Sequence, residues 1–303
     1  MAQTRCRELL DVLAVAGLYG LFVPEPLGGL GVDATTGGLV IEALAGGCLT
    51  TTFVWLQHQF SAVLISASGP AMRSRWIGDL AAGRCRAGVA FAHLRRPGPP
   101  AVRAEPTSNG WTISGSAPWV TGWGRIDVAV VGARHADDIV WVLVDAIARD
   151  TMRPARLRLA ALDASATVEL HFTDHVIDAE RVIAIEPVTD WMARDAAGMR
   201  ANGSLALGVA ARCARLLGST ALDDRVEASR AVLDAATVEQ MAAARAATSV
   251  LAVEASAALV ASGGGRSMVT DNHSQRLARE ALFLLVQGQN PAIRAEQRHL
   301  LGL

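Results

Sequence analysis

The sequence pattern changes twice along the chain, from helical spacing of apolar residues to short strand-like runs and back, and this order constrains the fold more than any single motif. Residues 1–86 carry apolar side chains at helical spacing, as in 53–67 and 71–82, with glycine and proline between the segments. Residues 87–186 consist of short runs rich in valine, isoleucine, tryptophan and threonine, which are typical of strands. Helical spacing returns in 187–303. We predict an N-terminal α-helical domain, a middle β-barrel or sandwich domain and a C-terminal α-helical bundle.

Individual elements can be placed within these three regions. The expected strands lie at 111–113, 126–131, 139–144 and 167–172, with turns at 109–110 and 136–138. The expected C-terminal helices lie at 189–218, 222–235, 237–262 and 270–288, with glycines at 263–265 as a stop. Helices, then strands, then helices again is an uncommon order, so few architectures remain.

The composition excludes several kinds of chemistry. The chain of 303 residues has a formal net charge of -1, which gives no electrostatic reason to expect a nucleic-acid or anionic-membrane partner. All 28 basic residues are arginines. A Walker lysine, a Schiff-base lysine and a Ser-x-x-Lys catalyst are therefore impossible.

Cysteine and histidine spacing predicts no metal site and no disulfide framework. The residues concerned lie far apart, with no C-x-x-C pair and no metal-ligand spacing: Cys6, Cys48, Cys85, Cys213, His171, His175 and His273. Apolar stretches are interrupted by Arg, Asp or Gly before they reach membrane-spanning length. We expect a cytoplasmic protein without membrane insertion.

Two segments carry a family resemblance. In residues 17–33 a Pro-Glu pair precedes a Gly-Gly-x-Gly turn and a helix, and Pro24 with Gly29 favours an extended entry and a tight turn. Residues 109–123 end in Trp119-Val120-Thr121-Gly122. These segments resemble the first-domain signature and the central strand pair of the acyl-CoA dehydrogenases, whose Trp-Ile-Thr-Asn motif lies beside the flavin.

The resemblance implies an FAD site at this strand end. An indole can cover one face of the flavin ring, and a threonine hydroxyl or a neighbouring backbone amide can bond its polar edge, so Trp119, Val120 and Thr121 are the expected contacts. The alternative is a core tryptophan with a surface threonine. Residues 166–181 and 275–294 are similar to the family's closing strand and last helices, so the likeness covers nearly the whole chain.

The catalytic glutamate of the family is not in its usual place. In the family this glutamate lies in a Tyr-Glu-Gly-Thr stretch and abstracts the α-proton of an acyl-CoA. The corresponding stretch of this sequence has Gln287 before Gly288. An amide cannot accept that proton. Some members carry the glutamate at the end of the first C-terminal helix, where the nearest carboxylates are Asp223 and Asp224. For these two, a solvated turn or a helix N-cap is the alternative.

The cofactor motifs also depart from the family. Its Thr-Glu-Pro-Gly-x-Gly-Ser-Asp stretch becomes Phe-Ala-His-Leu-Arg-Arg-Pro-Gly-Pro-Pro at 91–100, and its Arg-Lys-Gln-Phe-Gly segment has no counterpart around 222–237. Phe91 and His93, with Arg95 and Arg96, are candidate replacements, because arginines bind phosphates and histidine can bond a flavin edge. The alternative is that His93, like His58 on its helix, has a structural role.

These observations favour a flavoprotein oxidoreductase that acts on an acyl-CoA or a related small molecule. Two alternatives stay open: a non-catalytic paralogue that serves as the partner subunit of a complete dehydrogenase, and a flavin monooxygenase or oxidase on the same fold. Small residues on the helix faces of 200–217 and 241–260 suit close helix packing and predict a homo-oligomer, or a heteromer in the subunit case.

Overall fold

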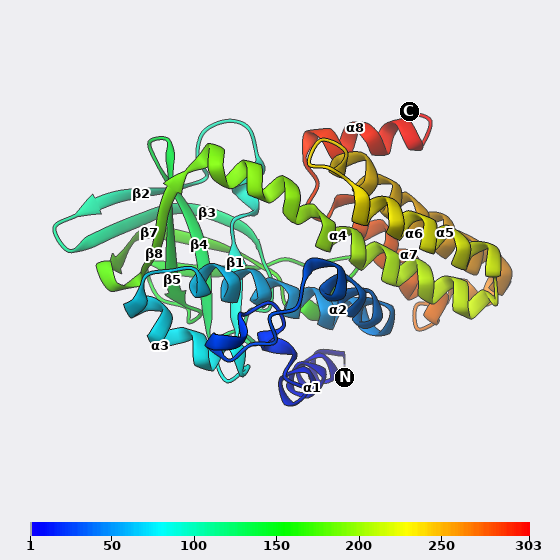
Figure 1. Cartoon of the computed structure of the whole chain (residues 1–303), viewed down its shortest axis with the longest axis horizontal. Coiled ribbons are helices and arrows are strands. Elements are labelled where there is room, and N and C mark those ends of the chain that lie inside the picture. Colours follow the sequence, from blue (N-terminus) through cyan, green and yellow to red (C-terminus); the bar gives the residue numbers. More distant parts are fainter. Residues whose placement is uncertain (1) are drawn as a thin grey trace. The chain divides into compact units, whose positions relative to one another are not determined.

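The computed structural model describes residues 2–303 and contains the three regions in the predicted order (Figure 1). It begins with α1 (Ala2–Val15), α2 (Ala34–Ser66) and α3 (Pro70–Ala81). Eight strands follow, and five helices come after them. The predicted fold class, helices followed by a β region and a helical bundle, is confirmed.

The middle region forms one eight-stranded sheet. Its strands are β1 (Ala87–Ala90), β2 (Val102–Thr107), β3 (Gly110–Val120), β4 (Val128–His135), β5 (Asp138–Asp145), β6 (Met152–Arg156), β7 (Val168–Asp178) and β8 (Val182–Pro187). Their order in the sheet is β6-β7-β3-β2-β4-β5-β8, and β1 pairs in parallel with β4. The four strands expected at 111–113, 126–131, 139–144 and 167–172 correspond to β3, β4, β5 and β7.

Alternating side chains give the sheet two apolar faces. Val131 and Val142 belong to one buried cluster, whereas their neighbours Val130 and Trp141 belong to another. The second cluster also contains Ile65 of α2 together with residues of α3. The second part of α2 and all of α3 therefore cover one face of the sheet, because a sheet must bury its apolar face against another element.

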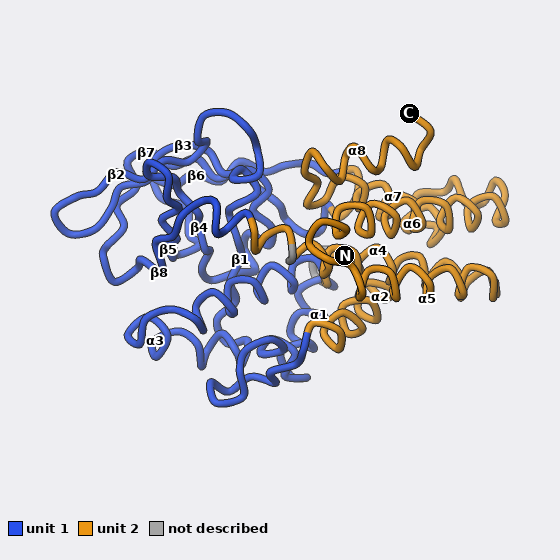
Figure 2. The backbone as a smooth tube through the Cα atoms, turned by 45° about the horizontal axis from the view of Figure 1, so that its top comes forward, with its two compact units in different colours: residues 1–33, 53–159, 163–192 blue, residues 34–52, 160–162, 193–303 orange. Residues whose placement is uncertain are grey.

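Contacts divide the chain into two compact units (Figure 2). Unit 1 comprises the residues up to Asp33, 53–159 and 163–192, and it holds the whole sheet. Unit 2 comprises 34–52, 160–162 and 193–303. Helix α2 contributes to both units and is interrupted near the boundary by the non-helical backbone of Cys48, with φ -152° and ψ 99°. The three-domain division at 86 and 186 stays a sequence prediction.

Unit 2 is helical. Its elements after the sheet are α4 (Val188–Leu217), of which all but the first turn lies in this unit, α5 (Thr220–Ala235), α6 (Met241–Gly263), α7 (His273–Val286) and α8 (Pro291–Leu300). Four of these helices match the segments expected from spacing. The fifth, α8, has a clear start signal, because the Asn290 side chain accepts from the Ile293 amide and Pro291 occupies the first turn.

Small residues let two helices of unit 2 approach closely. A Cβ atom on Gly208 of α4 would lie 2.3 Å from the carbonyl oxygen of Glu42 in α2, and one on Gly46 would lie 3.0 Å from the Gly208 carbonyl oxygen. Neither position has room for a side chain unless the backbones separate. The small-residue pattern at 200–217 therefore reflects packing within the chain at this crossing.

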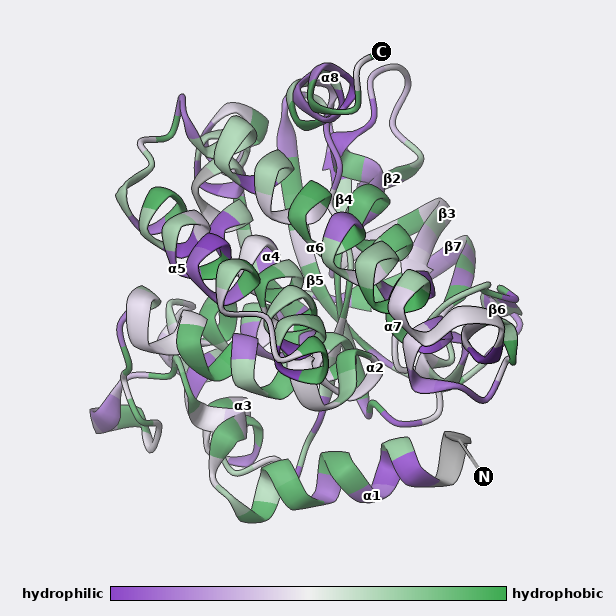
Figure 3. Cartoon of the chain, turned by 90° about the vertical axis from the view of Figure 1, so that its right-hand side faces the viewer, coloured by the Kyte–Doolittle hydropathy of each residue, from purple (hydrophilic) through white to green (hydrophobic). Residues whose placement is uncertain are grey.

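Two helical stretches are long and strongly apolar, and Figure 3 shows the hydropathy of each residue on the cartoon of the chain. Ala34–Ser66 and the helical stretch Met241–Met268 could cross a membrane by length and composition alone. Half of each apolar window is buried inside the protein, at 50% in both cases, and the core helices of soluble proteins pass the same test. This is weak evidence for a membrane span, and the expected absence of membrane insertion stays a prediction.

Candidate functional site

Strand β3 ends in a distortion that exposes Trp119. The pairing of β3 with β7 shifts register between Ala117 and Val120, so Pro118 and Trp119 form an irregularity in the ladder. Trp119 has a φ of 65° and is 46% exposed. Bulges redirect side chains, and positive φ at a non-glycine residue is a strained conformation that occurs at functional sites. The strained backbone conformation of Trp119 therefore accompanies the exposure of its indole to solvent.

The next two residues turn inward. Val120 is fully buried and pairs with Val168. Thr121 is also buried, and its hydroxyl lies 3.1 Å from the Thr167 hydroxyl, which in turn lies 2.8 Å from the Ser165 hydroxyl. The structure thus keeps Trp119, Val120 and Thr121 at one strand end, but it places the Thr121 hydroxyl in an internal network and only the indole at the surface.

Phe91 follows β1 and contacts three other rings. Its ring centroid lies 4.5 Å from that of Phe60 and 6.0 Å from those of Trp141 and Trp191. The Arg95 guanidinium lies 5.0 Å from the Phe91 centroid, within the range of a cation–π contact. Phe91 therefore belongs to an aromatic cluster on the helix-covered face of the sheet, and its contact with a cofactor stays a prediction.

His93 is a buried, uncharged histidine with one free acceptor. Its Nε2 lies 2.8 Å from the Gly132 carbonyl oxygen, so Nε2 carries the proton and donates. Burial lowers the pKa of His93 to about 4, although the Gly132 contact opposes this. Nδ1 is buried and has no partner among the described residues. A buried acceptor without a donor is costly, which makes Nδ1 a candidate contact for the N–H group of a ligand.

His58 on α2 has a structural role in unit 1. Its Nε2 lies 3.1 Å from the Leu80 carbonyl oxygen, and its Nδ1 accepts from the Ala87 amide at 3.0 Å. Burial lowers its pKa to about 3, so the ring is neutral at physiological pH. Both nitrogens are satisfied by backbone groups. His58 joins α2 to α3 and to the start of β1.

Gln287 lies at the C-terminal end of α7 in unit 2. Its Nε2 donates to Asn202 Oδ1 at 2.9 Å, and its Oε1 is buried without a partner among the described residues. Gly288 follows with a φ of 63°, in the left-handed conformation that commonly ends a helix. A Cβ atom there would approach Asn202 Nδ2 to 2.8 Å. Asn202 holds the Gln287 amide in place, and the correspondence of Gln287 to the family's base position stays a prediction.

Arg245 of α6 is a buried cation that sequence reasoning missed. It is 1% exposed, and its Nη2 donates to the carbonyl oxygens of Leu284 at 2.9 Å and Gln287 at 3.3 Å. Burial lowers its pKa to about 10, which leaves it protonated at neutral pH. The carbonyls at the C-terminus of α7 carry partial negative charge that offsets this cation. The sequence feature that could have indicated this buried cation is a single arginine within the first, Ala-rich turns of α6.

Asp224, the weak candidate for a replacement base, is exposed and directly follows Asp223, which lies in the first turn of α5. The helix begins at a cap in which the Ser219 hydroxyl accepts from the Leu222 amide. Acidic residues are favourable in a first turn because the helix dipole is positive there. This position supports the structural alternative for Asp223 and Asp224. Within residues 2–303, no group of three or more His, Cys, Asp or Glu could hold a metal ion.

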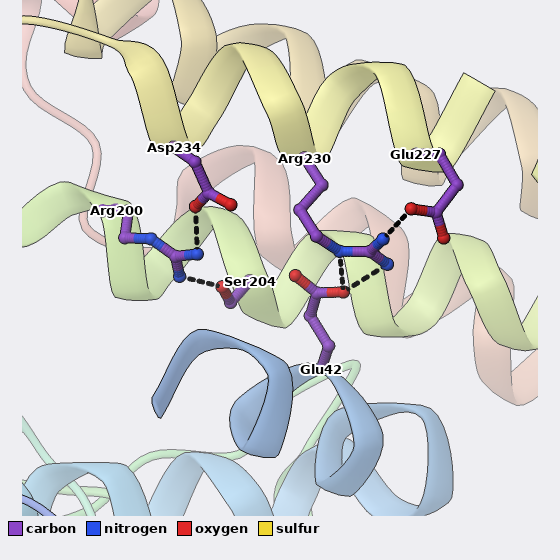
Figure 4. Close-up of polar contacts among 6 residues, drawn as sticks. All are labelled: Glu42, Arg200, Ser204, Glu227, Arg230 and Asp234. Carbon is purple, nitrogen blue, oxygen red and sulfur yellow. Dashed lines mark hydrogen bonds and ion pairs between the residues drawn. The ribbon is translucent and has the colours of Figure 1, made fainter. Parts of the chain in front are cut away.

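Two arginine-centred clusters connect helices of unit 2 (Figure 4). Arg230 of α5 contacts Glu42 of α2 through Nη2 at 2.7 Å, and it also pairs with Glu227. Arg200 of α4 pairs with Asp234 and donates to Ser204 at 2.8 Å. These charges neutralise one another and join three helices, so we assign them to stability.

A titration in unit 2 gives a stability prediction. Burial outweighs the contact with Arg276 and raises the pKa of Glu280 from its ordinary 4.5 to about 7. The folded protein therefore keeps a proton between about pH 4.5 and pH 7 that the unfolded chain releases, and stability falls as the pH rises through this window. The loss is on the order of 3 kcal/mol at most.

Glu280→Gln should remove this loss, because the amide does not titrate. Urea unfolding at about pH 5 and about pH 8 measures the difference in the free energy of unfolding. Glu254→Gln, at an exposed position, is the control and should keep the wild-type dependence. An unchanged pH dependence in Glu280→Gln would contradict the assignment.

Comparison with known families identifies the N-terminal region. Residues 2–84 match the family described as "Acyl-CoA dehydrogenase, N-terminal domain". No curated protein matches the sequence. The recognised family resemblance is thus supported by sequence in the first domain, where the Pro-Glu and Gly-Gly-x-Gly turn lies.

Solved structures extend the likeness to the whole chain. Butyryl-CoA dehydrogenase from Megasphaera elsdenii is 18% identical with a TM-score of 0.82, over 97% of this chain and 90% of that one. An acyl-CoA dehydrogenase from Geobacillus kaustophilus is 15% identical with a TM-score of 0.83, over 100% and 92%. A glutaryl-CoA dehydrogenase from Mycobacterium smegmatis, in complex with FADH2, is 18% identical with a TM-score of 0.80, over 100% and 89%. At these identities the likeness establishes the fold.

Proposed function

We propose that this protein is a flavin-dependent oxidoreductase that acts on an acyl-CoA or a related acyl thioester. The proposal is supported by the match of residues 2–84 to the N-terminal domain of the acyl-CoA dehydrogenases and by the acyl-CoA dehydrogenase fold of the whole chain. The observation that carries the proposal is the exposed indole of Trp119, held at positive φ where β3 loses its register with β7. A tryptophan that served only the core would be buried in a regular strand.

The residues of unit 1 fit a flavin ring in part. Trp119 offers an aromatic face, and His93 Nδ1 is an orphaned acceptor for a ring N–H group. The Thr121 hydroxyl is already paired with Thr167, so a contact from this residue would use its backbone. Bound FAD would supply the hydride acceptor. In this proposal Trp119 covers the ring, and Phe91 supports the neighbouring wall through its aromatic cluster.

The residues of unit 2 set a limit on the reaction. Gln287 can orient a polar group through its amide, but it cannot take an α-proton. Ordinary α,β-dehydrogenation therefore needs a base that this position does not supply. An oxidation that removes no α-proton, as in a flavin monooxygenase or oxidase, tolerates Gln287, and oxygen reactivity of the reduced flavin would distinguish it.

A second function is favoured by the same glutamine. Gln287 donates to Asn202, and if this amide occupies the base position, as the resemblance implies, it suits a paralogue that keeps the fold as a partner subunit of a complete dehydrogenase. That subunit would act within a heteromer, whereas the oxidoreductase proposal includes a homo-oligomer. A cytoplasmic location and a role in acyl-chain metabolism belong to both proposals.

The visible absorption spectrum of the purified chain, before and after addition of FAD, tests the proposal. We expect flavin bands, and about tenfold weaker FAD binding in Trp119→Ala, because loss of an aromatic stacking contact costs on the order of 1–3 kcal/mol. Ile185→Ala, at an exposed apolar position on β8, is the control and should bind FAD normally.

A wild-type protein that stays colourless and takes up no FAD would reject the oxidoreductase for the isolated chain and favour the partner subunit. Equal FAD affinity in Trp119→Ala and wild type would show that the indole does not contact the flavin.

A further inference from the structure

Arg245 of α6 is a buried cation that no carboxylate neutralises. Burial lowers its pKa to about 10, and no charged group among the described residues shifts it further. No described carboxylate forms an ion pair with it, and its Nε and Nη1 have no hydrogen-bond partner within residues 2–303. A buried charge of this kind costs folding free energy, and an apolar side chain of similar volume would fill the space at lower cost. Stability alone therefore does not account for an arginine at this position.

The contacts that Arg245 does make are with the C-terminal end of α7. Its Nη2 donates to the carbonyl oxygens of Leu284 at 2.9 Å and of Gln287 at 3.3 Å. The last carbonyls of a helix have no partner within that helix, and the helix dipole favours a cation beside them. Arg245 therefore caps two carbonyls at the end of α7 from a neighbouring helix.

A side chain of α8 holds the same helix end from another side. Gln297 is buried, and its Nε2 donates to the Leu285 carbonyl oxygen at 2.8 Å and to the Ser249 hydroxyl of α6 at 2.9 Å. Gly288 then turns the chain with its φ of 63°. The end of α7 is thus fixed within unit 2 by polar contacts from both α6 and α8.

The residue that these contacts hold is Gln287. Its backbone carbonyl accepts from Arg245, its Nε2 donates to Asn202, and its Oε1 is buried without a partner among the described residues. We infer that Arg245 is a positioning residue, which fixes the backbone at Gln287 and thereby orients the side chain with its unfilled acceptor. A side chain that is already ordered loses little conformational freedom when it binds a ligand. The inference rests on the proposed function, in which the Gln287 amide orients a polar group of the substrate.

Hydrogen–deuterium exchange of the full chain, followed by mass spectrometry, tests whether Arg245 fixes this turn. In Arg245→Met we expect about tenfold faster exchange of the amides at 285–290, because the lost hydrogen bonds come from a charged donor. Arg245→Lys keeps a charged donor and should restore most of the protection. The amides of α5 should exchange at the wild-type rate in both variants. Arg266→Met, at an exposed position after α6, is the control and should leave the turn unchanged.

The side-chain amide of Gln287 reports its own orientation. Its two Nε2 protons are identified in a two-dimensional NMR spectrum as the signals that Gln287→Glu removes. In Arg245→Met we expect these signals to shift and to exchange with water about tenfold faster, since the bond to Asn202 depends on the fixed backbone. Arg245 is bonded to the backbone carbonyl of Gln287, so a role in packing alone would leave the side-chain signals in place.

Equal effects of Arg245→Met and Arg245→Lys, or faster exchange throughout unit 2, would show that Arg245 acts through packing or global stability and would overturn the inference. Arg245→Gln replaces Arg245→Met if that variant does not fold, and failure of both neutral variants to fold would also overturn it. Neither measurement needs a flavin or an acyl-CoA. A negative result therefore leaves the oxidoreductase proposal standing, and a protein that takes up no FAD leaves the result on Arg245 unaffected.

Discussion

Replacing Gln287 by glutamate should give the FAD-loaded protein the ability to exchange an acyl-CoA α-proton with solvent deuterium. The substitution puts a carboxylate where the resemblance places the base, and a positioned general base contributes about 10²–10⁴-fold to a proton transfer. The wild-type amide has no basic site of this kind. We expect exchange to rise by that factor over wild type.

The surroundings of Gln287 can accept the change. The amide now donates to Asn202 Oδ1, and a carboxylate there requires the Asn202 side chain to turn and present Nδ2, which at present lies 3.5 Å from Met199 Sδ. The charged Arg245 lies against the Gln287 carbonyl and favours a nearby carboxylate in its ionised form. The new carboxylate should therefore be available as a base at neutral pH.

Proton NMR of butyryl-CoA in deuterated buffer measures the exchange. Gln289→Glu is the matched control, because it introduces the same charge two residues away, where Gln289 contacts Leu285 and Gln297. It should leave exchange at the wild-type level. If Gln287→Glu binds FAD and acyl-CoA but gives no exchange, Gly288 does not correspond to the motif glycine and the base position lies elsewhere.

Arg230→Met should cost about 3–5 kcal/mol of the free energy of unfolding, because it leaves Glu42 buried without its partner. Glu42 is 6% exposed, and its Oε1 already has no partner among the described residues (Figure 4). Arg230 is the cation that neutralises it, through contacts of 2.7 and 2.9 Å. The exposed Glu227 carboxylate should contribute little to the loss, since solvent screens it.

The same helix supplies the control for this experiment. Arg225→Met breaks a pair with Glu254 that is about half exposed on both sides, and such surface pairs contribute about 0–1 kcal/mol. Urea unfolding of both variants gives the comparison. Adding Glu42→Met to Arg230→Met should restore most of the loss, because no buried charge then remains. Equal losses in Arg230→Met and Arg225→Met would show that the Glu42 pair is effectively solvated.

Local pattern was enough to predict the elements. The Val-rich runs at 126–131 and 139–144 became β4 and β5 because a period of two side chains defines a strand with two buried faces. Helical spacing likewise predicted α4 to α7 to within a few residues. The family resemblance marked the motif around Trp119 as a candidate site, and it also gave the prediction that Gln287 replaces the catalytic glutamate.

The roles of individual side chains depended on neighbours that are remote in sequence. The hydroxyl of Thr121 is turned inward by Thr167, 46 residues away, and the buried Arg245 is held by carbonyls about 40 residues further on. Arg7 of α1 and Arg125 of the loop after β3 line one hollow of unit 1 although they lie far apart in sequence. No periodicity encodes these distances, because they follow from how the elements pack.

The sequence by itself determined the order of helices and strands and the family resemblance, and it gave the prediction that Gln287 stands at the position of the catalytic glutamate. Only the tertiary structure decided which polar groups are exposed, paired or left without a partner. Glu42 and Arg230 show the reason, since they lie 188 residues apart and are joined by the packing of α2 against α5. Burial and charge pairing depend on three-dimensional neighbours, whereas hydrophobic periodicity depends on adjacent residues alone.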